Sequence, residues 1–245
     1  MNPLFAGLFD DAALFPPAST PLAGAVASHV ARRESALAPL LGPFVCPAGD
    51  FGSLPSGLRV SLILPAADTP VPASPDIVAI EAPDAVPGPV TTYSEIPVAE
   101  IDATRLAALR AAGLRLKLRT GGVRAEMFPS EDALARALWA AVRGGLAFKL
   151  TAGLHDPIRH RDPVTGFEHH GFLNVLLATA RALQGYDIER TLADSDGERV
   201  AAGVAGIDDV LAKAVRHHFV SFGTCSIDEP VDGLLRYGLL PEDPR

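Results

Sequence analysis

The sequence predicts an α/β fold: a single (β/α)8 TIM-type barrel, in which eight parallel strands alternate with helices. Short apolar strand-like runs alternate with helical patterns along all 245 residues, and this order indicates a parallel sheet covered by helices. Eight such units in about this length favour a closed barrel. The phosphate-binding pattern Gly-x-Gly-x-x-Gly is absent after the first strand, which argues against an open doubly wound sheet.

The expected strands are short apolar runs bounded by turn-forming or charged residues. They cover residues 7–12, 44–47, 59–65, 77–82, 90–96, 114–119, 146–151 and 219–224. Helical periodicity predicts helices at residues 22–41, 101–112, 131–143, 172–183, 207–217 and 229–237. Ser130 is a typical N-cap, and Gly113 and Gly144 are typical of helix ends.

Two regions depart from the regular pattern. Prolines between residues 65 and 90 leave little helical periodicity, so the third and fourth helices are expected to be short or missing. Residues 152–218 form a connection of 67 residues between the seventh and eighth strands. Such a long connection leaves the end of the barrel where active sites are built, so we expect a lid there. Residues 1–245 are expected to form one domain.

Composition excludes several classes of partner. The 29 acidic and 21 basic residues give a net charge of -8, which disfavours nucleic acid. No apolar run approaches the roughly 18 residues of a membrane helix, and the first five residues lack the basic region of a secretory signal. Two cysteines are too few for a disulfide framework, so we expect the protein to be located in the reducing cytoplasm. A homo-oligomer is left open.

Lysine is rare, and two lysines occupy matching positions. Only Lys117, Lys149 and Lys213 occur among 21 basic residues. Charged and leucine residues alternate at positions 114–119, which sends Arg115, Lys117 and Arg119 into the barrel if the leucines face the helices. Lys149 occupies the same height on the next strand, so its ammonium group is expected near that of Lys117.

Three interpretations of the lysine pair follow. Two neighbouring cations suppress each other's protonation, and a neutral lysine forms imines with carbonyl compounds, which predicts Schiff-base chemistry. Alternatively, both lysines form structural ion pairs with Glu81 and Glu95. In the third interpretation, the lysines and Arg119 hold an anionic substrate without a covalent bond.

Glycine-rich strand ends add a second signal. Small residues at the ends of the last three strands expose backbone N–H groups, which often bind phosphate in barrels. The residues expected to bind an anion are Arg119, Thr120, Gly121, Gly122, Thr151, Gly153, Gly223, Thr224 and Ser226.

Three of these segments together resemble deoxyribose-phosphate aldolase, a class I aldolase on a (β/α)8 barrel. The segments are residues 117–121, 148–153 and 222–226. The resemblance implies that Lys117 forms a Schiff base and that Lys149 lowers its pKa. It also implies that the glycines and Ser226 hold a phosphate. The proton-relay aspartate of that family has no clear match, and Glu81 stands nearest.

Proton transfer is assigned to Glu81, Glu95 or His155, which follows the seventh strand. Tyr93 shares a strand face with Glu95. The expected function is therefore that of a lyase acting on a small anionic carbonyl compound through Lys117, without a cofactor.

Two alternatives stay open. One is a non-enzymatic anion-binding barrel. The other is a metal-dependent hydrolase or isomerase, whose divalent ion would be held by aspartates and loop histidines. Its candidate ligands are Asp10, Asp11, His155, Asp156, His160, Glu168, His169 and His170.

Overall fold

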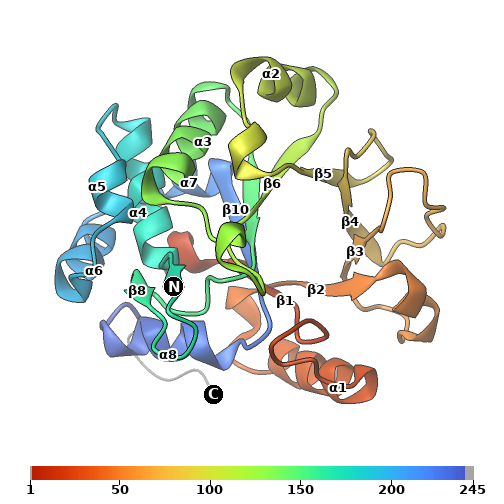
Figure 1. Ribbon diagram of the computed structural model, residues 1–245. Helices are drawn as coiled ribbons and strands as arrows, with labels where there is room; N and C mark the ends of the chain where they lie inside the picture. Colours follow the sequence, from red (N-terminus) through yellow and green to blue (C-terminus); the bar gives the residue numbers. More distant parts are fainter. Residues whose placement is uncertain (1, 241–245) are drawn as a thin grey trace.

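The computed structural model describes residues 2–240, so Met1 and residues 241–245 of the predicted domain lie outside the described residues. Eight parallel strands close into a barrel in the order β1-β10-β7-β6-β5-β4-β3-β2 (Figure 1). This confirms the predicted fold class, and every expected strand overlaps an observed one. The barrel strands are β1 (Phe9–Asp11), β2 (Leu41–Pro47), β3 (Val60–Ile63), β4 (Ile77–Pro83), β5 (Thr91–Glu95), β6 (Arg115–Arg119), β7 (Phe148–Thr151) and β10 (Phe219–Thr224).

Each predicted helix overlaps an observed one, and two of them match at both ends. They are α1 (Leu22–Arg33), α2 (Ala103–Ala111), α3 (Glu131–Arg143), α4 (Phe172–Leu183), α5 (Glu189–Leu192), α6 (Gly197–Ala205), α7 (Asp209–His218) and α8 (Asp228–Arg236). Helices α3 and α4 have the predicted limits, whereas α5 and α6 were not predicted. No helix among residues 2–240 is long and apolar enough to cross a membrane.

One predicted helix is too long. The expected helix over residues 22–41 ends at Arg33. The Ser35 hydroxyl donates to the Arg32 carbonyl oxygen and accepts from the Leu37 N–H, which replaces helical hydrogen bonds with a turn. Pro39 follows within a single 3-10 turn, and its missing N–H prevents the α-helix from continuing.

The barrel is covered unevenly. In the described chain no α-helix lies between β3 and β5, as the prolines predict, and a 3-10 helix at Ala48–Ser53 joins β2 to β3. Figure 1 shows α3 to α7 gathered on one side of the barrel and loops on the side of β3 and β4. The larger apolar core lies on the helical side, and a smaller one packs around β2, β3 and β4.

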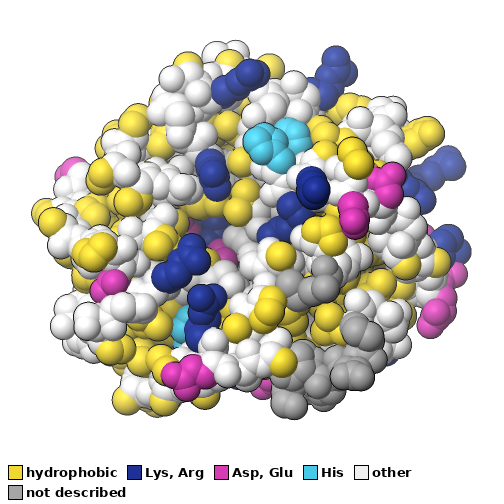
Figure 2. Space-filling view, turned by 180° about the vertical axis from the view of Figure 1, so that it is seen from behind, with side chains coloured by type: hydrophobic (Ala, Val, Ile, Leu, Met, Phe, Trp, Pro, Cys, Tyr) yellow, Lys and Arg dark blue, Asp and Glu magenta, His cyan; other side chains and the backbone are white. Residues whose placement is uncertain are grey.

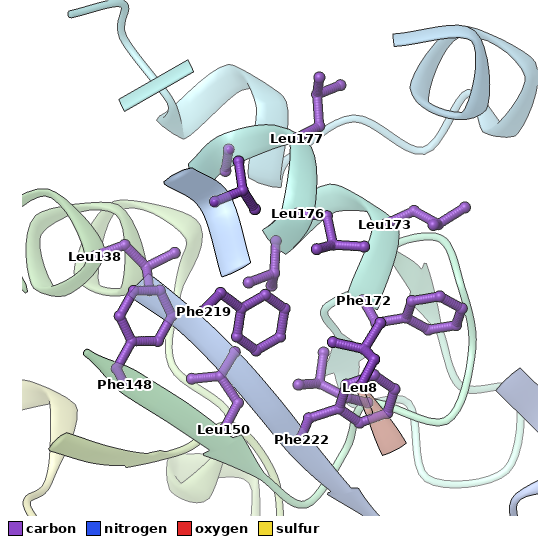
Figure 3. Close-up of a cluster of buried hydrophobic side chains, with 14 of the residues drawn as sticks. Leu8, Leu138, Phe148, Leu150, Phe172, Leu173, Leu176, Leu177, Phe219 and Phe222 are labelled. Carbon is purple, nitrogen blue, oxygen red and sulfur yellow. The ribbon is translucent and has the colours of Figure 1, made fainter. Parts of the chain in front are cut away.

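Aromatic side chains join the barrel to α4. Phe148 and Phe219 stack with their ring centroids 5.5 Å apart, and Phe172 and Phe222 stack at 5.3 Å. Figure 3 shows these rings between the strands and α4, together with Leu173 and Leu176. Ten residues of α4 are buried.

The long connection is therefore largely part of the core. Helices α4 to α7 pack on the barrel or on each other, so the lid expected over residues 152–218 is wrong for most of that segment. The part of the connection that lines the barrel mouth is residues 152–169, which run through the hairpin of β8 (His160–Arg161) and β9 (Glu168–His169).

Candidate active site

A cavity of about 600 Å³ opens at the carboxyl end of the barrel strands. Its acidic, basic and histidine lining residues come from β4, β5, β6, β7 and β9, together with loop residues His155 and Asp162. Its upper wall comes from the loops after β1 and β6 and from the hairpin β8–β9. This is the end of a (β/α)8 barrel at which catalytic residues collect.

The predicted lysine pair is confirmed in position. Lys117 on β6 and Lys149 on β7 are register partners, and Glu95 on β5 is the register partner of Lys117. Both lysine side chains are only 2% exposed. The alternation of leucine and charged residues therefore correctly predicts which side chains of β6 enter the barrel.

Lys117 lies between two carboxylates. Its Nζ is 2.7 Å from Glu81 Oε2 and 2.9 Å from Glu95 Oε2. The second carboxylate also binds Arg119, whose Nε is 2.8 Å from Glu95 Oε1. Both Lys117 and Glu95 line the cavity, so the amine is buried among protein groups yet accessible to a bound molecule.

Lys149 occupies a second ion pair next to the first. Its Nζ is 2.5 Å from Asp10 Oδ2 and 2.5 Å from Glu81 Oε1. It also lies 5.3 Å from the centre of the Tyr93 ring, close enough for a cation–π interaction. Glu81 thus bridges the two lysines, with one oxygen on each.

This bridge corrects one expectation about Lys149. Burial alone would lower the pKa of Lys149, but the Asp10 and Glu81 carboxylates raise it above its ordinary value. Burial would likewise raise the pKa of Glu81, but the two lysines hold it well below the usual range. Mutual suppression of protonation by two lysines does not hold for Lys149, because a carboxylate stands between them.

The adjacent aspartates of β1 face opposite ways, as strand alternation requires. Asp10 points into the barrel, where burial raises its pKa and its Oδ1 has no hydrogen-bond partner among the described residues. A side chain at Gly42 would collide with that oxygen. Asp11 faces outward, and its Oδ2 is 3.0 Å from Nδ1 of His29.

The charged groups form one continuous chain. It runs through Asp10, Lys149, Glu81, Lys117, Glu95 and Arg119, with negative and positive groups alternating. Two serines that sequence reasoning missed support its carboxylates: Ser221 donates to Asp10 and Ser61 donates to Glu81. Each serine is a polar residue inside a strand at an inward-facing position, and that pattern was the available signal.

The residues predicted to bind an anion separate into two groups. Arg119, Gly122, Thr151, Gly153 and Gly223 line the cavity. The others, Thr120, Gly121, Thr224 and Ser226, lie outside its lining.

Two of the residues outside the lining have structural hydrogen bonds instead. The Thr120 hydroxyl donates to the Ala152 carbonyl oxygen at 2.7 Å, and the Thr224 hydroxyl donates to the Ser226 carbonyl oxygen at 2.8 Å. Arg119 is paired with Glu95.

Gly121 and Gly153 let the ends of β6 and β7 approach closely. Gly153 has φ +75°, and a Cβ there would lie 2.8 Å from the Thr120 carbonyl oxygen. We expect Gly153→Ala to lower the free energy of unfolding by about 2–4 kcal/mol, through backbone strain and a backbone collision.

The matched control for Gly153→Ala is Gly57→Ala. Gly57 has φ +85° on an exposed turn with nothing within 4 Å, so strain alone predicts about 1 kcal/mol. Urea denaturation of both variants makes the comparison. Equal losses of unfolding free energy in the two variants would show that a Cβ at Gly153 causes no collision between the ends of β6 and β7.

The upper wall of the cavity is apolar. Phe128 lies 5.1 Å from the Phe167 ring and 4.6 Å from the His169 ring. Val123 and Val164 line the same cavity and are 80% and 90% exposed. Apolar side chains this exposed at a cavity rim are available to a bound ligand.

The loop histidines are dispersed. His160 and His169 pair across the hairpin, and His170 Nε2 bonds the Pro129 carbonyl oxygen at 2.8 Å. His155 lines the cavity and contacts Glu229, its Nδ1 lying 2.7 Å from Oε2. Among residues 2–240, no group of three or more His, Cys, Asp or Glu side chains is arranged to hold a metal ion.

The fold and this cavity define the class of protein as a (β/α)8 barrel with a charged site at the carboxyl end of its strands. Comparison of the chain with protein-family models, curated proteins and solved structures finds no match. The resemblance to deoxyribose-phosphate aldolase therefore stays a prediction.

Proposed function

We propose that the protein is a lyase that makes or breaks a carbon–carbon bond of a small carbonyl compound through an imine at Lys117. The placement of Lys117 carries the proposal. Its side chain is 2% exposed and lines the cavity, and its amine contacts two carboxylates within 2.9 Å. A buried lysine in a cleft with acidic partners has the groups that imine formation needs.

Imine formation requires Lys117 to lose a proton, and the ion-pair chain offers a route. Lys149 passes a proton to Asp10 and takes one from Glu81, and Glu81 in turn takes one from Lys117. The net transfer leaves Lys117 neutral and Asp10 protonated, with Glu81 and Lys149 charged as before. Asp10 suits the end of this route, because burial raises its pKa.

The chemical step then follows from the imine. The neutral amine adds to the carbonyl carbon. A carboxylic acid group of the site then returns a proton to the hydroxyl, and loss of water gives a protonated imine. This group accepts the electron pair of a neighbouring carbon–carbon bond, so the bond breaks and an enamine forms. The hydroxyl on the departing carbon gives its proton to a carboxylate, and that carbon leaves as an aldehyde or ketone. Glu95, whose side chain is 24% exposed, is the partner of Lys117 in best contact with solvent.

The cavity wall supports a substrate with an apolar part. Phe15, Met127, Phe128, Val164 and Phe167 surround the entrance. Lys117, Lys149 and Arg119 each have a carboxylate partner. These ion pairs leave the anionic group of the substrate a prediction. The cytoplasmic location is also a prediction.

Borohydride trapping tests the proposal. The protein is incubated with neutral aryl and alkyl aldehydes, ketones and sugar phosphates, reduced, and analysed by intact mass and peptide mapping. We expect one stable adduct on Lys117, and we expect Lys117→Arg to lose it completely, because arginine keeps the charge but cannot form an imine. Lys213→Arg is the matched control, since Lys213 is exposed on α7.

The outcomes separate the alternatives. An adduct that persists in Lys117→Arg would refute Lys117 as the imine-forming residue. No adduct with any compound, together with stoichiometric metal in the purified protein, would favour the metal-dependent hydrolase or isomerase. Saturable binding without adduct or turnover would favour an anion-binding barrel.

A further inference from the structure

A second group of reactive side chains lies at the rim of the same cavity. Cys225 follows β10, His155 follows β7, and Glu229 belongs to the first turn of α8. Cys225 and His155 both line the cavity. None of the three belongs to the ion-pair chain around Lys117.

The thiol and the carboxylate both contact the imidazole of His155. Its Nδ1 is 2.7 Å from Glu229 Oε2, and Cys225 Sγ lies 3.9 Å from Nε2 and 4.0 Å from Nδ1. The carboxylate thus orients the imidazole with Nδ1–H as donor, which leaves Nε2 to take the thiol proton. A nucleophile, a base and an orienting acid in this order form the constellation used in nucleophilic catalysis.

The surroundings of His155 favour its protonated form. Burial alone would lower the pKa of His155, but the Cys225 sulfur and the Glu229 carboxylate raise it to about 9. The other groups near His155 are the Thr224 hydroxyl, 3.5 Å from Nδ1, and His169 on β9, whose pKa is lowered by burial and by His160 and His155. A cysteine beside a protonated histidine is a reactive one.

We propose that Cys225 is a nucleophilic thiolate, activated by His155 and Glu229, that takes electrophilic aldehydes entering the cavity. The thiolate sulfur forms a bond to the carbonyl carbon while the carbon–oxygen π bond breaks. The imidazolium Nε2–H gives its proton to the oxygen, which yields a neutral thiohemiacetal. The reverse steps release the aldehyde, so no oxidant or further reactant is needed.

The second cysteine provides an internal control. Cys46 on β2 is fully buried in the smaller apolar core, and its Sγ donates to the Pro47 carbonyl oxygen at 3.2 Å. Burial and the Asp50 charge raise its pKa to about 12. Cys46 is therefore expected to stay a protonated, unreactive thiol.

The test is alkylation of the folded protein by iodoacetamide from pH 5.5 to 9, with peptide mapping of each cysteine. We expect Cys225 to react at least about tenfold faster than Cys46 at pH 6.5, with a rate that changes little up to pH 8. In His155→Gln the rate at pH 6.5 is expected to fall at least about tenfold and to rise through the ordinary thiol range near pH 8.5. Glu229→Gln changes an exposed residue, and we expect it to lower the alkylation rate of Cys225 at pH 6.5 by a smaller factor.

A competition experiment identifies the ligand class. Excess benzaldehyde is expected to slow alkylation of Cys225, in the natural protein and in Lys117→Arg alike, because this site does not require the imine.

Three results would overturn the proposal. They are a Cys225 rate profile identical with and without His155, an unreactive Cys225 in a protein whose circular dichroism is native, and alkylation that benzaldehyde leaves unchanged. Denaturation in urea, which should make both cysteines equally reactive, verifies the reagent.

Discussion

Glu81→Gln is expected to lower the free energy of unfolding at pH 7 by about 3–5 kcal/mol, because it removes the charge between two buried lysines. Glu81 is 2% exposed and its two oxygens lie 2.7 Å from Lys117 Nζ and 2.5 Å from Lys149 Nζ. Glutamine keeps the shape but turns an N–H₂ group toward one ammonium. Two cations then share the barrel interior without the carboxylate that separates them.

Urea denaturation measures this loss, and Glu126→Gln is its control. Glu126 pairs with Arg124 at 3.1 Å on the surface, where both side chains are at least 65% exposed, so less than about 1 kcal/mol is expected. A loss below about 1 kcal/mol for Glu81→Gln would mean that water already screens the lysine pair.

The same variant has a pH dependence of known sign. The lysines hold the pKa of Glu81 well below its ordinary 4.5. Its contribution to stability is therefore present above pH 4.5 and is lost as the pH falls below that value. The difference in free energy of unfolding between the natural protein and Glu81→Gln should therefore shrink on acidification. A difference that grows would contradict the lowered pKa of Glu81.

The sequence could predict the barrel and its lysine pair because both depend on local periodicity. Alternation with period two decides which residues of β6 and β7 face inward, and parallel pairing then places Lys117 opposite Lys149. Helix α3 matches at both ends because Ser130 caps one end and Gly144 follows the other.

The electrostatic partners could not be predicted in the same way. β1 has only three residues, Phe9–Asp11, so alternation requires one of its two aspartates to face inward but does not say which. The choice comes from contacts with Lys149, Ser221 and Gly42, which the sequence separates by 32 to 211 residues.

The rim of the cavity could not be predicted from the sequence either. The strands of the hairpin β8–β9 have two residues each, too few for a periodic pattern. Glu229 contacts His155 across 74 residues of sequence, and no local sequence pattern around either residue predicts this contact. The first turn of α8 is acidic, as in many helices, so its second function as a histidine partner depends on the closed barrel.

Lys149→Met is expected to destabilise the protein by about 3–5 kcal/mol at pH 7, through the carboxylate that it leaves behind. Methionine fills nearly the same volume, so packing changes little. Glu81 keeps Lys117 as a partner, but Asp10 loses the ammonium group of Lys149 and retains the Ser221 hydroxyl at 2.7 Å. The cost should therefore lie almost entirely in the charge of Asp10, and removing that charge should recover much of it.

The double variant Lys149→Met with Asp10→Asn tests this directly, and pH gives an independent readout. Burial already raises the pKa of Asp10 above its ordinary 3.8, and loss of Lys149 raises it further. A folded-state pKa above the unfolded one means that the deficit of Lys149→Met shrinks as the pH falls through that raised value. We expect the double variant to be more stable than Lys149→Met at pH 7 and to lack this pH dependence. The contrary result is that the stability losses caused by Lys149→Met and by Asp10→Asn simply add and do not vary with pH. Asp10 would then be neutral in the natural protein and could not accept the proton of Lys117.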